Sequence, residues 1–446
     1  MPKATLNPAR RRPLAWAAVL VLAAGCVTGC AASNAQMASA PPPQPLAPCA
    51  WWYGIGQPPS PNDLQLAAQR YSVVVLNADQ GAAMRKLHAL NPKIKVLAYK
   101  DLSSTRDYPG AVVDGKDAQF LPTGIGYVAA QQQHPDWFAT DTGGRRIEWQ
   151  GYPQHWQMTV WDPAYQQAWS SAVVTEISQQ GWDGVLADND FNSLSHYSRA
   201  VLAGTANASE TDRKLRDGLD AFLSLVGDAF RKAGKAFVPN VSETHLVPGR
   251  WTAHSRFGGA MEENFGFRED AGTGGLLTFQ GNEFQEMRAQ AALGESLLLL
   301  ITRTRSEQQD RAGYASAALL AGPQTCWTPA TTDDYRNPEW SDLQGSGLGE
   351  AIDAAGRQAN GIWTRTFTNG WVAVNPTSAT QSVTPPPGLV SADGRKRTAP
   401  APSAPSSAPS SAPSSAPSSD SPAPSSVAPE PVQLSAADGL VLVKPK

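Results

Sequence analysis

A short apolar run that ends in several carboxylates is the feature of this chain that points most directly to chemistry. Residues 182–190 read Trp-Asp-Gly-Val-Leu-Ala-Asp-Asn-Asp and follow a long amphipathic segment. Continuous apolar runs are typical of buried parallel strands, and α/β proteins carry their active sites at the carboxyl ends of such strands. Asp188 and Asp190 are therefore candidates for acid–base or nucleophilic chemistry. The alternative is that one of them caps a helix or turn.

A second acidic pair, Glu262-Glu263, ends another predicted strand. Glutamate is poorly suited to a strand interior, so two in succession require a reason. One alternative is that one faces solvent and the other pairs with a nearby arginine, such as Arg250 or Arg268. The sequence has no Gly-x-Ser-x-Gly motif, no phosphate-binding loop and no histidine spacing typical of zinc. We therefore expect no metal and no cofactor, and the carboxylates remain as the reactive groups.

Strand and helix signals alternate along residues 49–335 and predict an α/β fold, a (β/α)8 TIM barrel. We expect strands at residues 51–56, 72–76, 95–99, 184–188, 236–240, 259–264, 296–302 and 324–327. Helices are expected at residues 61–71, 82–90, 163–181, 215–230, 280–293 and 308–321. The alternative is a doubly wound open sheet, but the glycine-rich loop that such a sheet carries after its first strand is missing. The long segment up to residue 162 is expected to cover the site.

In a barrel, the ends of the fourth and sixth strands face each other, which would bring Asp188 towards Glu262 and Glu263. Glycoside hydrolysis needs such a pair, because one carboxylate attacks or stabilises the sugar carbon while the other protonates the leaving oxygen. Asp162 also precedes a proline at a predicted helix start, which favours a capping role. Candidates for substrate binding at the barrel mouth are Tyr53, Tyr99, Asp101, Asp162, Asn189, Asp190, Asn240 and Arg303. Sugar faces could also stack on tryptophans in predicted loops, namely Trp137, Trp149, Trp156 and Trp161.

The barrel predicts a disulfide between Cys49 and Cys326. The first and eighth strands are neighbours in a closed barrel, and these two cysteines lie at or near them. Disulfides persist in exported proteins. The alternative is two independent buried thiols.

Residues 1–30 resemble a bacterial lipoprotein signal peptide, with a basic start and an apolar stretch too short to span a bilayer. Cys26 and Cys30 both follow small residues, and we favour Cys30 as the lipidated residue. An ordinary secretory signal is the alternative. The mature protein is thus expected outside the cytoplasm, held to the membrane by its lipid anchor alone. Residues 31–48 read as a flexible tether.

The net charge of −3, without a basic patch, gives no expectation of nucleic-acid binding. A monomer is expected, with a polysaccharide as its partner. Residues 336–446 are predicted to form a small antiparallel β unit, with a hairpin around Asn369-Gly370 and strands near residues 382–392 and 432–443. Asp438-Gly439 is a turn signal within the last of these segments. Residues 398–431 consist largely of Ala-Pro-Ser-Ser repeats and are expected to be a disordered insertion.

Four segments, in order along the chain, resemble a known family: residues 91–99, 158–165, 181–189 and 365–376. They are similar to the "hypothetical glycosyl hydrolase 15" proteins, which are distantly similar to the endo-α-1,4-polygalactosaminidase-like family. The resemblance implies a TIM barrel with a β-rich C-terminal piece, Asp188 as nucleophile and a strand-six glutamate as acid. It does not choose between Glu262 and Glu263, and it implies no substrate.

The sequence therefore predicts an exported glycoside hydrolase that cleaves an α-linked polysaccharide by a two-carboxylate, retaining mechanism. One alternative is a non-catalytic, glycan-binding envelope lipoprotein on an inactivated barrel. Another is a polysaccharide deacetylase, which would need a His/Asp metal site that the sequence does not offer.

Overall fold

The computed structural model describes residues 46–52, 58–267, 276–331, 335–394 and 430–445. Several predictions lie outside these residues: the signal peptide with Cys30, nearly all of the tether, Tyr53 and the repeats of residues 398–429. Within the described ranges, no helix combines the length and the apolar character needed to cross a membrane.

Eight parallel strands close into a barrel and confirm the predicted (β/α)8 fold. Around the barrel their order is β1-β12-β11-β10-β9-β8-β3-β2. Their bounds are β1 (Ala47–Trp52), β2 (Val73–Asn77), β3 (Lys95–Asp101), β8 (Gly184–Asp190), β9 (Ala236–Val241), β10 (Gly259–Glu262), β11 (Leu297–Arg303) and β12 (Thr325–Ala330). Nearly every strand residue is buried, as expected for strands covered on both faces.

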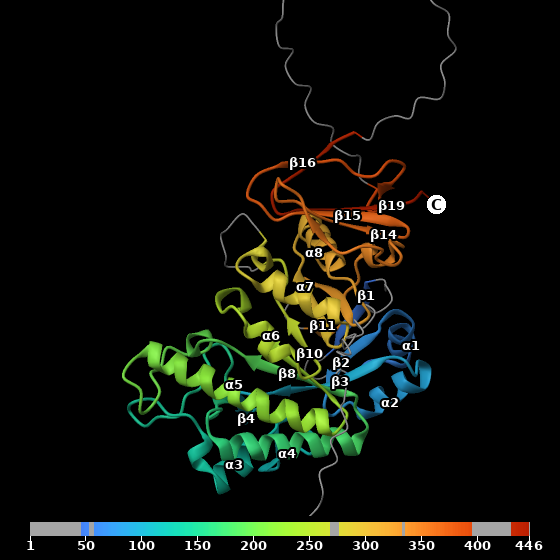
Figure 1. The fold of residues 1–446 in the computed structure, drawn as a ribbon. Helices are drawn as coiled ribbons and strands as arrows, with labels where there is room; N and C mark the ends of the chain where they lie inside the picture. Colours follow the sequence, from blue (N-terminus) through green and yellow to red (C-terminus); the bar gives the residue numbers. More distant parts are fainter. Residues whose placement is uncertain (1–45, 53–57, 268–275, 332–334, 395–429, 446) are drawn as a thin grey trace, which may run out of the picture. The chain divides into compact units, whose positions relative to one another are not determined.

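Helices follow most of these strands along the chain (Figure 1). Asp162 caps α4 by accepting from the backbone N–H of Ala164 at 2.7 Å, and Gly181 ends that helix in a left-handed conformation. The helices α4 and α5 pack side by side. The bounds are α1 (Pro61–Arg70), α2 (Gly81–Leu90), α3 (Tyr127–Gln133), α4 (Pro163–Gln180), α5 (Ala208–Lys232), α6 (Arg250–Ser255), α7 (Glu283–Leu293) and α8 (Glu307–Leu319).

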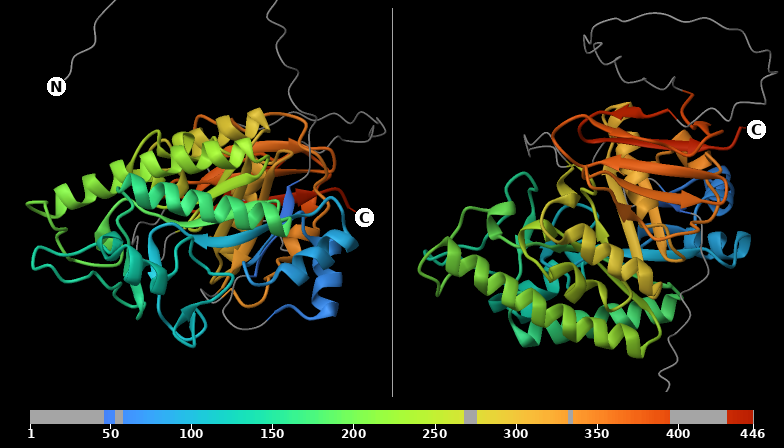
Figure 2. Two further views of the ribbon diagram at one scale, coloured as in Figure 1. Left: turned by 90° about the horizontal axis from the view of Figure 1, so that it is seen from below. Right: turned by 45° about the horizontal axis from the view of Figure 1, so that its top comes forward.

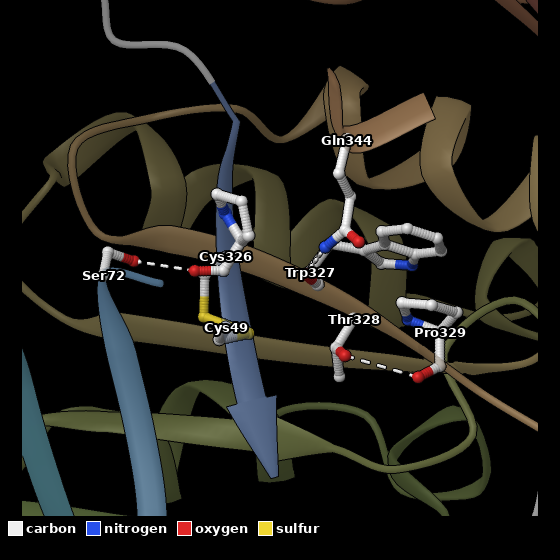
Figure 3. The surroundings of a disulfide bond; sticks show 8 residues. Cys49, Ser72, Cys326, Trp327, Thr328, Pro329 and Gln344 are labelled. Carbon is white, nitrogen blue, oxygen red and sulfur yellow. Dashed lines mark hydrogen bonds between the residues drawn. A yellow bond between two sulfur atoms is a disulfide. The ribbon is translucent and has the colours of Figure 1, made fainter. Parts of the chain in front are cut away.

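The first strand begins earlier than predicted. β1 starts at Ala47 rather than at residue 51, two positions before the predicted start of the barrel domain at residue 49. Pro48 has no N–H to donate, but its carbonyl accepts from the N–H and the hydroxyl of Ser72, at 3.0 and 3.1 Å. These bonds join the strand to its neighbour in spite of the proline (Figure 3).

Cys49 and Cys326 form a disulfide between β1 and β12, with their Cα atoms 5.5 Å apart (Figure 3). The two strands pair in parallel, which brings together cysteines separated by 277 positions. The pair is the one that neighbouring first and eighth strands predict.

The segment between β3 and α4 has structure of its own. It contains α3 and two small antiparallel sheets, β4 (Ser104–Arg106) with β7 (His155–Gln157), and β5 (Val112–Val113) with β6 (Lys116–Asp117). β4 begins three residues after β3 ends, so this segment starts at the barrel mouth.

The C-terminal part forms antiparallel sheets, the larger of which packs against α8. This sheet has the order β13-β14-β15-β19-β17, and β16 pairs with β18. Figure 2 shows these orange and red strands lying together at one side of the barrel. The predicted turn at Asp438-Gly439 is wrong: both residues lie inside β19, and the chain turns before them, where Ala437 is left-handed. The bounds are β13 (Gly356–Arg357), β14 (Trp363–Phe367), β15 (Gly370–Asn375), β16 (Gln381–Val383), β17 (Val390–Ser391), β18 (Val432–Leu434) and β19 (Asp438–Val443).

Candidate active site

Asp188 lies near the carboxyl end of β8, on the side of the strand that faces the barrel interior. Leu186, two residues earlier, belongs to the interior apolar cluster. The pairing of β8 with β9 is irregular between Ala187 and Asp190, and Asn189 has a φ of 69°. This bulge interrupts the alternation of side chains. Asp190 therefore does not join Asp188 but lies buried against Arg250 and His254 of α6.

Glu263, rather than Glu262, lies with Asp188 at the mouth. Met261 of β10 belongs to the interior cluster, so Glu263 shares its side and Glu262 has the opposite one. Glu263 accepts from Arg303 Nη2 at 2.8 Å and from the hydroxyl of Tyr335 at 2.7 Å. The side chain of Glu262 is buried on the outer side of β10, away from the barrel interior.

One side-chain amide joins the two mouth carboxylates. The Nδ2 atom of Asn240, on β9, donates to Asp188 Oδ1 at 2.9 Å and to Glu263 Oε2 at 2.8 Å. These two oxygens can be no farther apart than the sum of those distances. The two carboxyl groups are therefore close enough to act on the same glycosidic bond.

The second oxygen of Asp188 is bound by Tyr99 of β3. The Tyr99 hydroxyl donates to Asp188 Oδ2 at 2.6 Å and accepts from Arg106 Nη2 at 3.1 Å. Arg106 also donates to Asp101 Oδ2 at 2.9 Å. Asp101 is fully buried and binds the turn after β3 through the N–H groups of Ser103 and Ser104, so its role is to hold Arg106 and this turn.

The charges of the site interact strongly. Burial, together with the negative charges of Glu263 and Asp101, raises the pKa of Asp188 to about 6, although the bonds from Tyr99 and Asn240 oppose this shift. A carboxyl group with such a pKa can exchange a proton near neutral pH.

The remaining predicted residues fall into two groups. Asn189 and Arg303 belong to the site, since the N–H of Asn189 donates to Asp188 Oδ1 at 2.8 Å and Arg303 binds Glu263. Asp162 caps α4 and Asp190 is part of a buried ion-pair network, so neither lies at the mouth. Among the loop tryptophans, Trp137 and Trp149 are buried, while Trp156 and Trp161 are half-buried.

Three residues at the mouth escaped the sequence analysis: Arg106, Tyr197 and Tyr335. Tyr197 follows β8 and donates from its hydroxyl to Asn189 Oδ1 at 2.5 Å. None of the three lies in a barrel strand, so no periodic pattern marks them. Their proximity to the carboxylates depends on the conformation of the segments that connect the barrel strands.

Within the described ranges, no group of three or more His, Cys, Asp or Glu side chains is arranged to hold a metal ion. The site therefore offers paired carboxyl groups, a cation beside one of them and tyrosine hydroxyls beside both. These groups can transfer protons and stabilise positive charge on a bound substrate.

Comparison with known proteins finds no match among curated sequences. Among solved structures, an α-amylase from Anoxybacillus is 10% identical, covers 90% of this chain and 98% of its own, and has a TM-score of 0.43. A noncanonic maltogenic α-amylase, AmyB, from Thermotoga neapolitana is 11% identical, with 76% and 88% covered and a TM-score of 0.44. The α-L-fucosidase isoenzyme 2 from Paenibacillus thiaminolyticus is 13% identical, with 66% and 47% covered and a TM-score of 0.42.

A family model matches the sequence itself over most of the barrel. The model of "Hypothetical glycosyl hydrolase family 15" matches residues 88–371, which is more than half of the chain. The match runs from the helix before β3 into β15 and includes Asp188, Asn240 and Glu263. The chain, a glycoside hydrolase-type TIM barrel, belongs to the hypothetical glycosyl hydrolase family 15.

Proposed function

We propose that the protein is an exported glycoside hydrolase that cleaves a polysaccharide, with Asp188 and Glu263 as its two catalytic carboxyl groups. The observation that carries the proposal is the shared amide of Asn240, which donates to both groups at the barrel mouth. A non-catalytic, glycan-binding barrel would not need two carboxyl groups to converge in this way. We propose an α-linked polysaccharide as the substrate, and aminosugar-containing polymers are among the first candidates to be tested.

A retaining mechanism fits the separation of the carboxyl groups. Their nearest bridged oxygens lie within the sum of 2.9 and 2.8 Å. Retaining glycosidases hold their carboxyl groups about 5–5.5 Å apart, whereas inverting enzymes leave about 6.5–9.5 Å for a water molecule. The observed limit is compatible with the shorter spacing.

We assign Asp188 as the nucleophile and Glu263 as the acid/base. Three donors hold the oxygens of Asp188: the hydroxyl of Tyr99, the amide of Asn240 and the N–H of Asn189. Glu263 would first protonate the leaving oxygen and then deprotonate water. The alternative is the reverse assignment, in which Glu263, with Arg303 Nη2 at 2.8 Å, is the nucleophile.

The first test is the release of reducing ends from a panel of purified extracellular polysaccharides. Asp188→Asn and Glu263→Gln should each lower the rate by on the order of 10³-fold or more while leaving thermal unfolding nearly unchanged. Glu262→Gln is the matched control, since it makes the same change one position away and outside the mouth, and it should retain activity. Full activity of Asp188→Asn would refute the assignment. Glycan binding without cleavage by the wild type would favour the non-catalytic alternative.

The second test separates the two role assignments by chemical rescue with azide on an activated aryl glycoside. Azide that replaces the nucleophile attacks from the nucleophile's side and yields a glycosyl azide of inverted anomeric configuration. Azide that acts in the acid/base variant displaces the enzyme nucleophile and yields the retained configuration. Asp188→Gly should give the first product and Glu263→Ala the second. The opposite pairing of variants and products would establish Glu263 as the nucleophile.

We also infer that the chain is lipidated at Cys30 and displayed outside the cytoplasm. The Cys49–Cys326 disulfide supports export, because such bonds persist in oxidising compartments. Metabolic labelling with an alkynyl fatty acid should label the wild type and Cys26→Ala, but not Cys30→Ala. Loss of label in Cys26→Ala but not in Cys30→Ala would identify Cys26 as the lipidated residue. The absence of label from the wild type would favour an ordinary secretory signal.

A further inference from the structure

Rings from three parts of the chain pack together beside the carboxylates. Tyr108, Trp149, Tyr152, His155 and Tyr197 form this cluster, which we call the aromatic wall. Trp149 and Tyr197 stack with their centroids 3.9 Å apart and their planes 9° from parallel. Tyr152 meets Tyr197 edge to face at 5.4 Å, and His155 lies 5.7 Å from Tyr152 and 5.5 Å from Tyr108. The rings thus form one contiguous cluster.

Both ends of the aromatic wall are tied to Asp188. At one end, the Tyr197 hydroxyl donates to Asn189, the residue after Asp188. At the other end, Arg106 donates to the hydroxyls of Tyr108 and Tyr99, at 3.3 and 3.1 Å, and Tyr99 donates to Asp188. Hydrogen bonds therefore link the aromatic wall at both ends to the catalytic carboxyl group.

The aromatic wall is buried at Trp149 and exposed at Tyr152. Trp149 is only 3% exposed, and its indole N–H donates to Gln157 Oε1 at 2.9 Å. His155 and Tyr197 are half-buried, and the outermost ring, Tyr152, is 52% exposed. Rings that are fixed before binding lose little entropy when a ligand packs on them.

The aromatic wall is also uncharged at neutral pH. Burial, followed by the positive charge of Arg106, lowers the pKa of His155, so its imidazole remains neutral. An uncharged aromatic surface beside polar groups suits a ligand that has one apolar face and hydroxyls at its edge.

We propose that the aromatic wall is a sugar-binding subsite, with Tyr152 as its outer ring. Its ligand would be a neutral pyranose unit of the polysaccharide, with its C–H face against the rings, next to the unit that is cleaved. This inference rests on the proposed function. If the wall served only to support Asn189, the exposed ring of Tyr152 would contribute nothing to binding.

The test is glycan affinity measured by affinity gel electrophoresis over the same panel, in an Asp188→Asn background so that no glycan is consumed. Tyr152→Ala should raise the Kd about tenfold, because stacking on one ring is lost, whereas Tyr152→Phe keeps the ring and should change the Kd less than about twofold. Trp340→Ala is the matched control. Trp340 is 37% exposed and packs on Tyr71, which precedes β2 at the end of the barrel opposite the mouth.

The outcomes separate the two proposals. If the wild type cleaves a glycan and Tyr152→Ala binds it as tightly as Trp340→Ala does, the subsite is refuted and the proposed function stands. If glycan is bound but not cleaved, and Tyr152→Ala loses binding, the subsite stands and the proposed function fails. If the wild type neither binds nor cleaves any glycan of the panel, both are refuted. Thermal unfolding of each variant checks that loss of binding is not loss of fold.

Discussion

The hydroxyl of Tyr99 has a single proton, and its neighbours decide where that proton points. Arg106 can only donate, so it occupies a lone pair of the Tyr99 oxygen and leaves the proton for Asp188. The bond from Tyr99 favours the ionised form of Asp188, against burial and the charges of Glu263 and Asp101. Arg106 is therefore a positioning residue that acts on the catalytic carboxyl through Tyr99.

This arrangement predicts how activity depends on pH. As nucleophile, Asp188 must be ionised, so kcat/KM should fall as the pH drops below about 6, the raised pKa of Asp188. Tyr99→Phe removes a bond to the ionised form, which should raise that pKa further and move the acidic limb of the profile up by about 1 pH unit. Tyr314→Phe loses a hydroxyl in α8, far along the chain from the site, and should leave the limb in place. An unmoved limb in Tyr99→Phe would show that this bond does not govern the titration.

Of the site residues, Asp188 could be predicted from sequence and Glu263 could not be separated from Glu262. Asp188 follows an apolar run that marks a strand end. β10 is buried on both faces, so its side chains show no alternation of apolar and polar types from which the inward side could be read. The direction of the Asp190 side chain depends on the bulge at Asn189, and no local sequence pattern predicts that bulge.

At the level of elements, β10 and α7 meet at two buried carboxyl groups. Glu262 is 6% exposed and Glu283 only 2%. Burial raises the pKa of Glu262 to about 7 and raises that of Glu283 as well, where the charge of Glu262 adds to the effect. Thr244 Oγ1 donates to Glu262 at 3.3 Å, and His245 Nδ1 lies 3.9 Å from Glu283. The interface between strand and helix thus favours protonated carboxyl groups.

This interface should make stability depend on pH. The folded protein holds a proton on Glu262 up to pH about 7, whereas the unfolded chain releases it near pH 4.3. The stabilising effect of that proton is complete below pH 4.3 and is lost as the pH rises through 7. Glu262→Gln should therefore gain stability relative to the wild type between pH 5 and pH 8, by about 1–3 kcal/mol in urea unfolding. Glu307→Gln, with a side chain that is 91% exposed, should show no such gain. If Glu262→Gln and the wild type differed in free energy of unfolding by the same amount at pH 5 and at pH 8, the prediction would be contradicted.

The barrel elements could be predicted because each carries a local signal: apolar runs for the strands, and capping residues with periodic apolar positions for the helices. α5 shows the limit of this reasoning, since it begins at Ala208 rather than at residue 215. Its first turns are polar, and Asn207 caps it by accepting from the N–H of Glu210 at 3.0 Å. The small sheets before α4 have strands of two or three residues, which is too short for any periodic pattern.

At the scale of the molecule, the disulfide closes a loop with a sequence separation of 277 residues at the seam of the barrel. Its removal should cost about 2–5 kcal/mol of stability, chiefly because the unfolded chain gains freedom. Reduction of the wild type should lower its Tm to that of the double variant Cys49→Ser, Cys326→Ser, and reductant should leave the double variant unaffected. An equal Tm with and without reductant in the wild type would show that the bond contributes nothing.

One helix, α8, packs against both the barrel and the C-terminal sheet. The predicted domain boundary at residue 335 gives no sign of this shared packing. α8 packs on β11 and β12 of the barrel and also on β15 and β19 (Figure 1). Arg311 of α8 binds Asp438 at 3.2 Å, and Arg365 donates to the carbonyl of Leu319 at 2.9 Å. Such contacts between distant segments follow from packing and leave no local trace in the sequence.

The place of β19 within its sheet bears on how the protein is made. This strand lies between β15 and β17, yet it leaves the ribosome only after the whole run of Ala-Pro-Ser-Ser repeats. Until then the edge of β15 has no partner strand, and the side of α8 that β19 covers is exposed to solvent. The nascent polypeptide is therefore vulnerable to proteases and to non-native strand pairing. A premature stop codon within the repeats would spare every catalytic group yet should yield a product that is cleared by quality control.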